Sequence, residues 1–297
     1  MFKLYVEAFK PMNTEKYIDL HTHTTFSDGT YTPSELIKEA KRRNLAAIAI
    51  TDHDCTSGID EAIDVGALLG IEIISGIELA AYYPSPKKTE IHILGLFVDH
   101  KNPLFISEIK KLMDARDLRN IEMTKKLTSM WLPITYDELM EEAGIGSCSR
   151  AHYAKLMVKK GYVKTKKEAF QKYIGTGKPG FVPRPLPSPK ECIDLIVRSG
   201  GCAILAHPTL YKIDFKEIYS MAKDLKEQGL VGIEAMYSTF TTPQEKKITE
   251  IAKKLDLIPS GGSDFHGLNK ADIFLGVGKG NLRIPYSFLE QLKSCTK

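Results

Sequence analysis

Short runs of aliphatic residues alternate along this chain with amphipathic stretches of helical length, and this alternation limits the folds open to it. Leu45–Thr51 is a continuous apolar run, which is typical of a strand buried on both faces. Pro33–Arg43 repeats apolar residues at helical spacing behind Thr32, a suitable cap. Further strands are expected at 17–20, 71–79, 91–98, 202–206, 232–236, 257–261 and 273–277, with helices near 57–69, 188–199, 214–228, 242–255 and 285–294. This order predicts an α/β fold with a parallel sheet that closes into a barrel.

The βα rhythm stops between residues 104 and 186. Only helices are expected there, at 104–129, 135–143, 149–160 and 165–174, followed by a Pro- and Gly-rich segment up to 187. We therefore expect a helical module inserted into the barrel. The predicted organisation is an N-terminal extension (1–16), a first barrel part (17–103), a helical basic insertion (104–186) and a second barrel part (187–297).

The inserted segment carries the positive charge of the chain. Residues 107–183 hold fifteen Lys and Arg against nine Asp and Glu, whereas the whole chain has a net charge of only +4. From Arg150 to Lys178 there are nine basic residues and one acid. A solvated helix face explains such a run, and so does a surface that faces phosphate groups. Composition alone favours the solvated face.

Composition excludes several classes of protein. No apolar run approaches the roughly 18 residues of a transmembrane helix, and residues 1–16 lack a secretory signal. The five cysteines are scattered and never form C-x-x-C, which excludes a zinc ribbon and argues against a disulfide scaffold. A cytoplasmic protein with no membrane and no obligate protein partner is expected.

The histidines carry most of the chemical information. His21 and His23 follow the first predicted strand, and alternate residues of an extended chain point to one face. Other candidates recur where predicted strands end: Asp28, His53, Glu78, His207, Asp264 and His266. His92 is the exception, because it begins a predicted strand. Barrel enzymes build their active sites at the C-terminal strand ends.

Together these residues predict a metal centre. A single histidine is more often a surface residue than a ligand, and a single Asp after a strand is usually a helix cap, but the ensemble is not explained in that way. The set exceeds what one catalytic zinc needs, so we expect two or three divalent ions. Mixed imidazole and carboxylate ligation suits Zn, Mn or Fe. Clustered ions of this kind are suited to hydrolysing phosphate esters. Neither a nucleophile elbow nor a dinucleotide-binding glycine motif competes with this interpretation.

The same residues resemble the polymerase and histidinol phosphatase (PHP) family of metal-dependent phosphoesterases. Seven motifs match in order: Asp19-Leu-His-Thr-His23, Ser27-Asp-Gly29, Thr51-Asp-His-Asp54, Gly76-Ile-Glu78, Glu90-Ile-His92, Ala206-His-Pro208 and Gly262-Ser-Asp-Phe-His266. The resemblance implies a distorted (β/α)7 barrel with three metals. It implies three ligand sets: His21, His23, Glu78 and Asp264; a bridging Glu78 with His92 and His207; and Asp28, His53 and His266. Some family members have His where this chain has Asp28.

The insertion narrows the resemblance. Ser149-Arg-Ala-His152 and the segment up to Arg184 look like the TrpH-type subfamily, whose members hydrolyse nucleoside 3′,5′-bisphosphates or trim short RNA from its 5′ end. A small nucleotide or a short RNA is thus the expected substrate. Arg150, His152 and Arg184 become candidates for phosphate binding, since guanidinium groups match phosphate oxygens. Helix capping and surface display are the alternative roles for these three residues.

The expected reaction is attack of a metal-bridging hydroxide on phosphorus. Asp264 would orient the hydroxide or take its proton, and His207 or His266 would assist the leaving oxygen. Three alternatives stay open at this stage. They are hydrolysis of histidinol phosphate or another small phosphomonoester, C–N hydrolysis as in amidohydrolases, and a metal-binding module that has lost catalysis.

Overall fold

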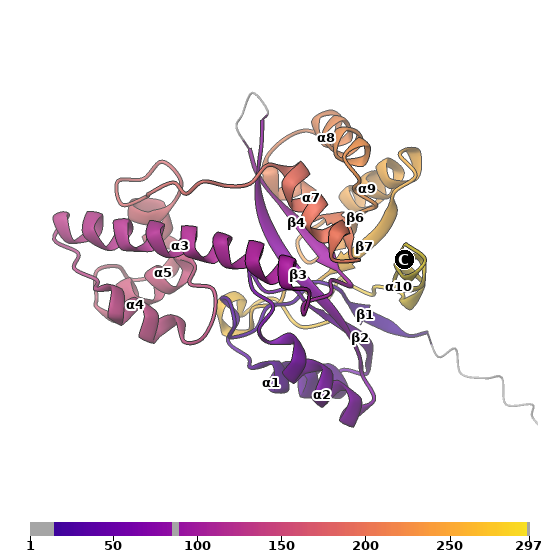
Figure 1. Ribbon diagram of the computed structural model, residues 1–297, viewed down its shortest axis with the longest axis horizontal. Helices are drawn as coiled ribbons and strands as arrows, with labels where there is room; N and C mark the ends of the chain where they lie inside the picture. Colours follow the sequence, from indigo (N-terminus) through magenta and orange to yellow (C-terminus); the bar gives the residue numbers. More distant parts are fainter. Residues whose placement is uncertain (1–14, 85–88, 296–297) are drawn as a thin grey trace, which may run out of the picture.

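A seven-stranded, nearly closed barrel forms the centre of the protein in a computed structural model that describes residues 15–84 and 89–295 (Figure 1). Residues 1–14 of the expected N-terminal extension lie outside the described residues. The strands are β1 (Tyr17–Asp19), β2 (Leu45–Ile50), β3 (Glu72–Tyr83), β4 (Thr89–Leu96), β5 (Cys202–Leu205), β6 (Gly232–Tyr237) and β7 (Ile258–Gly262), hydrogen-bonded in that order. Leu20 N donates to Gly261 O at 3.2 Å and Asp264 N to His21 O at 2.9 Å, which brings the last strand back to the first. The predicted barrel is confirmed, with the seven strands that the family resemblance implies.

The expected parallel sheet is wrong at one strand. β4 is antiparallel to both β3 and β5, whereas the other neighbouring pairs are parallel. Only a few residues separate β3 from β4, and a short connection forms a hairpin because a parallel crossover needs a dozen residues or more. The reversal explains the exceptional position of His92, because the beginning of β4 lies at the edge where the parallel strands end.

The strand expected at 273–277 is also wrong. The segment forms turns, with one isolated bridge between Phe274 and Gly278. Gly276 and Gly278 have φ of +72° and +57°, which a strand does not allow. The backbone N–H of Gly276 instead donates to Asp19 at 2.7 Å. The segment therefore closes one end of β1 and adds no strand.

Helices cover the outside of the barrel: α1 (Pro33–Arg42), α2 (Ile59–Leu69), α7 (Pro189–Arg198), α8 (Phe215–Glu227), α9 (Thr242–Lys254) and α10 (Tyr286–Lys293). Several of these helices begin at capping residues that can be recognised in the sequence. Thr32 and Glu35 form a reciprocal capping box before α1, and Ser188 and Glu191 form one before α7. Among the described residues, no helix combines the length and the apolar character that crossing a bilayer requires.

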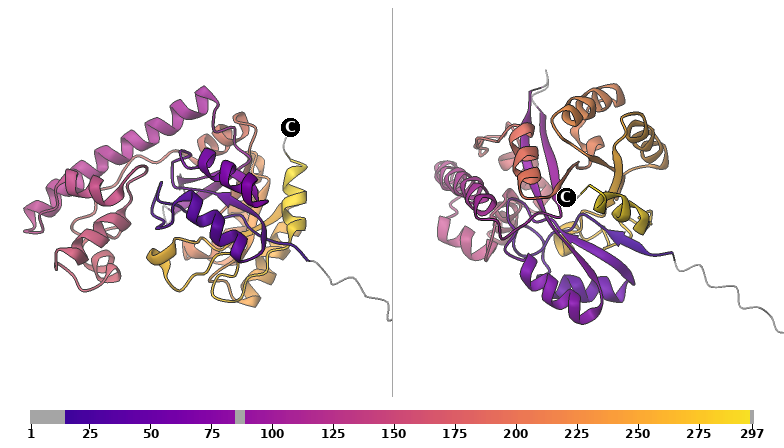
Figure 2. Two further views of the ribbon diagram at one scale, coloured as in Figure 1. Left: turned by 90° about the horizontal axis from the view of Figure 1, so that it is seen from below. Right: turned by 45° about the vertical axis from the view of Figure 1, so that its right-hand side comes forward.

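A second group of helices lies to one side of the barrel (Figures 1 and 2). It comprises α3 (Pro103–Ser129), α4 (Tyr136–Ala143), α5 (Arg150–Lys159), α6 (Lys166–Ala169) and a π-helical turn at Phe170–Ile174. We call this group the helical subdomain. It has its own apolar core, which includes Met123, Leu127 and Tyr153. The first turns of α3 pack elsewhere, since Phe105 and Ile109 belong to the core between the barrel and its outer helices. The helix α3 thus joins the two cores.

Candidate metal centre

The predicted metal ligands converge at the edge of the barrel where the parallel strands end. His21 and His23 leave β1 in an extended segment that Thr22 pins by bridging to Phe265. All three residues of this segment are fully buried. The structure groups the remaining candidates around them in sets whose ligand atoms lie within 4.8 Å of one another. The members of these sets are His21, His23, Asp28, His53, Glu78, His92, His207, Asp264 and His266.

Four residues surround the end of β1, and we call them the His21 set: His21, His23, Glu78 and Asp264. The Nε2 atoms of His21 and His23 are 3.1 Å apart, and each lies 3.3 Å from Oε2 of Glu78. Oδ1 of Asp264 lies 3.6 and 3.3 Å from the same two nitrogens. Ligands held tetrahedrally by metal–ligand bonds of about 2.0–2.1 Å lie about 3.3–3.4 Å apart. The two imidazole nitrogens lie at about this distance from each other and from both carboxylate oxygens, so they can share an ion such as zinc with either carboxylate.

Glu78 presents its two carboxylate oxygens to two different sets. Oε1 lies 2.7 Å from Nδ1 of His92 and 2.9 Å from Nε2 of His207. Oε2 faces His21 and His23, and it also lies 3.1 Å from Nδ1 of His53. Oε2 is buried without a hydrogen-bond partner. A buried carboxylate oxygen in that state is costly, and a cation would satisfy it.

Asp28 anchors a third set. Its Oδ1 lies 3.1 Å from Nε2 of His266 and 3.9 Å from Nε2 of His53, and it too is buried without a hydrogen-bond partner. His53 therefore lies between the second and third sets. The other carboxylate oxygen, Oδ2, accepts a hydrogen bond from Ser149 Oγ at 3.0 Å. Ser149 caps α5, so this set is connected directly to the helical subdomain.

Charge compensation governs the protonation of the centre. Burial opposes ionisation of Glu78, but the surrounding His53, His92 and His21 outweigh it and hold the pKa of the carboxyl well below its usual range. Burial likewise opposes protonation of His23 and His92, yet the facing carboxylates raise the pKa of His23 to about 9 and that of His92 to about 10. In His53 burial prevails and lowers the pKa to about 3. Without metal, protons on His23 and His92 therefore supply positive charge that bound cations would otherwise supply.

Two side chains that the motifs did not identify hold Asp264. Its Oδ2 accepts from Tyr237 Oη at 2.6 Å and from Lys270 Nζ at 2.5 Å. Burial would raise the pKa of Asp264, but Lys270 and the neighbouring imidazoles hold it well below its usual range. With one oxygen held in this way and the other facing His21 and His23, Asp264 is suited to orientation and ligation. The other predicted role, accepting the proton of the hydroxide, stays a prediction.

The two histidines expected to assist the leaving oxygen lie within the ligand sets. His207 directs Nε2 to Glu78, and His266 directs Nε2 to Asp28 and Nδ1 to the carbonyl of Asp264 at 2.9 Å. Neither lines the open cavity beside the centre. Their role as proton donors stays a prediction.

A cavity of about 730 Å³ opens from the metal centre toward the helical subdomain. Asp28, His53 and His92 lie on its barrel side. Four arginines lie on the other side, contributed by α3, by α5 and by the segment that returns to the barrel: Arg116, Arg119, Arg150 and Arg184. Arg150 and Arg184 were predicted to bind phosphate, whereas Arg116 and Arg119 on α3 were not. The cavity thus joins imidazoles and carboxylates to a cluster of guanidinium groups.

Asp54 fixes two of these arginines. Its Oδ2 accepts from Arg116, and from Nη2 of Arg184 at 3.0 Å. Burial would raise the pKa of Asp54, but the two guanidinium groups lower it. The residue follows His53 directly with φ of +52°. Asp54 therefore ties the helical subdomain to the loop that carries His53, a candidate metal ligand.

Arginine donors remain free for an anion. Nη2 of Arg119 and Nη1 of Arg184 are buried without a hydrogen-bond partner. Arg150 lies over the Phe181 ring, at 5.3 Å from its centroid. Burial and the neighbouring Arg116 lower the pKa of Arg119 to about 9. Crowded cations with unsatisfied donors favour an anionic ligand.

His152 is not brought to this cavity. It is buried in α5, where its Nδ1 accepts from the backbone N–H of Ser149 at 3.0 Å and completes a capping box. Burial lowers its pKa, so the ring is not a cation at neutral pH. The observed contacts of His152 are therefore those of a helix cap, the alternative role expected from the sequence.

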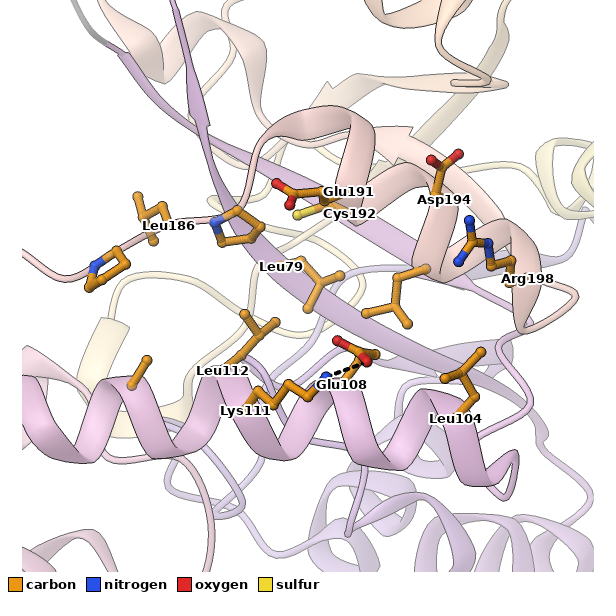
Figure 3. A pocket seen from close by; sticks show the side chains of 14 residues that line it. Leu79, Leu104, Glu108, Lys111, Leu112, Leu186, Glu191, Cys192, Asp194 and Arg198 are labelled. Carbon is orange, nitrogen blue, oxygen red and sulfur yellow. Dashed lines mark hydrogen bonds and ion pairs between the residues drawn. The ribbon is translucent and has the colours of Figure 1, made fainter.

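A separate cavity of about 560 Å³ lies between α3 and α7 (Figure 3). Leu79, Leu104 and Leu112 face it, and Lys111 at its edge is paired with Glu108 at 2.6 Å. No histidine and none of the residues of the metal sets line this cavity. This cavity therefore lacks the candidate metal ligands that line the other one.

Comparisons with known proteins agree with this geometry. The sequence matches the model of the PHP domain over residues 19–179, more than half of the chain. A 5′-3′ exoribonuclease of Haemophilus influenzae is 36% identical over 253 residues, covering 85% of this chain and 90% of that protein. A 3′,5′-nucleoside bisphosphate phosphatase of Chromobacterium violaceum is 34% identical over 250 residues, covering 84% of this chain and 87% of that protein.

Two solved structures share the fold over 95% of this chain and 97% of their own, each with a TM-score of 0.83. One is 31% identical and is described as an amidohydrolase from Chromobacterium violaceum with bound sulfate and no metal. The other is 28% identical and is described as a metal-dependent phosphoesterase from Bifidobacterium adolescentis. The chain therefore belongs to the PHP-domain family of metal-dependent phosphoesterases, as its motifs predict, and is a hydrolase of phosphoester bonds.

Proposed function

We propose that this protein hydrolyses nucleotide phosphoesters that carry a second phosphate close to the reacting one. The substrates are nucleoside 3′,5′-bisphosphates, which would lose the 3′-phosphate, and short RNA, which would lose nucleotides from its 5′ end. The observation that carries the proposal is the single cavity that places metal-ligating side chains opposite four arginines. A monophosphate needs only one of these two ends.

The ligand sets would hold two or three divalent ions of Mn, Zn or Fe. Their buried, unpartnered oxygens on Glu78 and Asp28 fit cations, and their mixed donors fit those metals. Bound ions would supply Lewis-acid polarisation of the phosphoryl group and a water of lowered pKa. Asp264, held by Tyr237 and Lys270, would orient the reacting group at this end of the cavity.

The arginines would bind the second phosphate. Arg119 and Arg184 have buried donors without partners, and Arg150 lies beside them in the cavity wall. A guanidinium group can donate two parallel hydrogen bonds to a phosphate. Held at both ends, the substrate would present one phosphoester to the metal ligands in a fixed position, which is the entropic part of catalysis.

A relative that acts on nucleoside 3′,5′-bisphosphates and another that is a 5′-3′ exoribonuclease support both substrates. A phosphatase of the histidinol phosphate type, the alternative function, would not use the arginines of the cavity, because its substrate has one phosphate. C–N hydrolysis, or metal binding without catalysis, does not explain why candidate metal ligands and four arginines line one cavity. The cytoplasmic location predicted from the scattered cysteines stays a prediction.

The test is phosphate release, with added Mn²⁺, from adenosine 3′,5′-bisphosphate, 3′-AMP, 5′-AMP and a short 5′-phosphorylated RNA. We expect fast release from the bisphosphate with 5′-AMP as product, and little from either monophosphate. Shortening of the RNA from its 5′ end would support an exonuclease activity as strongly as the phosphatase activity. Equal rates on the monophosphates would contradict the proposal, as would silence on all four substrates from metal-loaded protein.

A further inference from the structure

Glu234 is a buried carboxylate that none of the motifs contains. It lies in the middle of β6 and is fully buried. The pairing of β6 with β7 is irregular between Glu234 and Met236, and bulges of this kind re-aim a side chain. A carboxylate inside an otherwise apolar strand is costly unless it is well bonded. Its partners therefore indicate its task.

Both oxygens of Glu234 are taken up by metal-ligand residues from two different sets. Oε1 lies 3.0 Å from Nδ1 of His21, and Oε2 accepts from the backbone N–H of His207 at 2.5 Å. His21 faces Oε2 of Glu78 through its other nitrogen, Nε2, whereas His207 faces Oε1 of Glu78. One side chain thus supports two sets at once.

The contact with His21 fixes the proton of the ring. A carboxylate only accepts, so Nδ1 of His21 carries the hydrogen of this bond. In a metal-loaded centre the lone pair of Nε2 is then directed at the other residues of the His21 set. Carboxylates that hold ligating histidines in this way orient the ring and raise its basicity.

The contact with His207 holds an unusual backbone. His207 has φ of +28° and is followed by Pro208, a conformation that a non-glycine residue adopts only at a cost. The N–H of that residue is buried, and Glu234 provides the partner for it. The side chain of His207 reaches Glu78 from this backbone position, so the bond fixes where its Nε2 points.

We propose that Glu234 is a positioning residue that sets the metal affinity of the His21 set and the His207 set together, while leaving the set of Asp28, His53 and His266 unaffected. The inference rests on the metal-dependent function proposed above. The inference is tested by measuring the binding of ions, whereas the proposed function is tested by measuring turnover.

The test compares Glu234→Gln with the matched control Asp19→Asn. Glutamine keeps the size of the side chain but has only one acceptor, so its amide group would face a donor either at His207 or at His21. To relieve that clash, the ring of His21 would move its proton to Nε2 and lose its metal lone pair. Asp19 is equally buried and accepts hydrogen bonds from the backbone N–H groups of His21, Ser263 and Gly276. The control therefore removes one buried charge near the centre without touching an imidazole.

Mn²⁺ affinity and stoichiometry would be measured by chelator competition on folded, metal-free protein. We expect Glu234→Gln to weaken the ions of the two supported sets by about 10- to 100-fold, while the ion of the Asp28 set and the Asp19→Asn variant stay within about threefold of wild type. Wild-type affinities in Glu234→Gln would overturn the inference. So would an equal loss in both variants, because general charge removal would then explain it.

A second measurement needs no variant and therefore holds even if Glu234→Gln does not fold. In Zn²⁺-loaded wild-type protein labelled with ¹⁵N-histidine, His21 should carry its proton on Nδ1, and a proton on Nε2 would overturn the inference. If the wild type binds ions as expected but hydrolyses no phosphoester, the proposed function fails while the inference about Glu234 stands.

Discussion

The two ends of the active cavity differ in how the chain builds them. Most of the candidate metal ligands lie at or just beyond the ends of the barrel strands, and Asp28 lies in the loop that follows β1. The arginines come from α3, α5 and the return segment, and Asp54 holds two of them, Arg116 and Arg184. The sheet therefore positions most of the barrel end, whereas the arginine end depends on the helical subdomain staying docked.

Removal of the carboxylate shared between ligand sets should have the largest effect. Glu78→Gln takes the charge from the group whose two oxygens face five imidazoles. Losing several kcal/mol of charge stabilisation corresponds to a fall in kcat/KM of at least about 10³-fold. The measurement is kcat/KM on the bisphosphate together with metal content.

The matched control is Glu72→Gln at the opposite end of the same strand, where the carboxylate pairs with Lys293 at 2.6 Å. It should keep both metal content and rate. A Glu78→Gln variant with full metal content and near-normal rate would show that the barrel end is not the reacting end.

Acid should weaken metal binding strongly and unequally. The pKa of His23 is raised to about 9 and that of His92 to about 10, so both rings are protonated at neutral pH without metal. The pKa of His21 is also raised well above its usual value. An ion of the His21 set must displace two protons and an ion of the His92 set one, so the apparent affinity should rise with pH by about 100-fold per unit for the first and about tenfold for the second. His53, with a pKa lowered to about 3, and His266, whose pKa is also lowered, have no proton to release.

Calorimetry in buffers of different ionisation enthalpy at a pH of about 7.5 would count the protons. About two or more should be released by ions entering the sets of His23 and His92, and few by the ion of the Asp28 set. Equal release from every site would contradict the charge distribution described here.

The contribution of Arg119 should be smaller and specific to substrate. Arg119→Met removes a buried donor without a partner. Hydrogen bonds to charged groups contribute about 1.5–3 kcal/mol, so kcat/KM on the bisphosphate should fall by about 10- to 100-fold. The low rate on 3′-AMP should not change, because that substrate has no second phosphate.

Lys159→Met is the matched control, since it removes a cation from the same subdomain at an exposed position. It should leave both rates unchanged. An equal loss on mono- and bisphosphate after Arg119→Met would assign Arg119 to the fold of the subdomain and not to the second phosphate.

The sequence predicted the barrel end far better than the arginine end, for a physical reason. Strand ends meet at one edge whatever the details of packing, so motifs at strand ends suffice to assemble the ligands. Even the exception, His92, lies at that edge once β4 is reversed. Ile273–Val277 was misassigned because an apolar run interrupted by a single glycine resembles a short strand.

Arg116 and Arg119 could not be distinguished by sequence from the other cations of a long, charged helix. Their burial depends on how α3 packs against α5 and the return segment, which is a tertiary property. Glu234 did leave a signal, a charged residue inside the apolar strand Gly232–Tyr237, and Lys270 left none. Supporting residues are set by partners that are distant in the chain, and local pattern does not show them.

The smallest effect is expected from the exposed lysines that first drew attention to the basic segment. Lys164, Lys167 and Lys178 are exposed and line neither of the two large cavities. Exposed cations contribute little to binding at physiological salt because they are screened. The triple change to glutamine should keep bisphosphate hydrolysis within about twofold and leave the salt dependence of RNA cleavage unaltered. If these lysines instead bind phosphates of a longer strand, the slope of log KM against log salt should fall by about 0.7 for each phosphate that the variant no longer neutralises. That result would extend the arginine end of the cavity across the surface of the subdomain, and its absence would confine substrate recognition to the buried guanidinium groups.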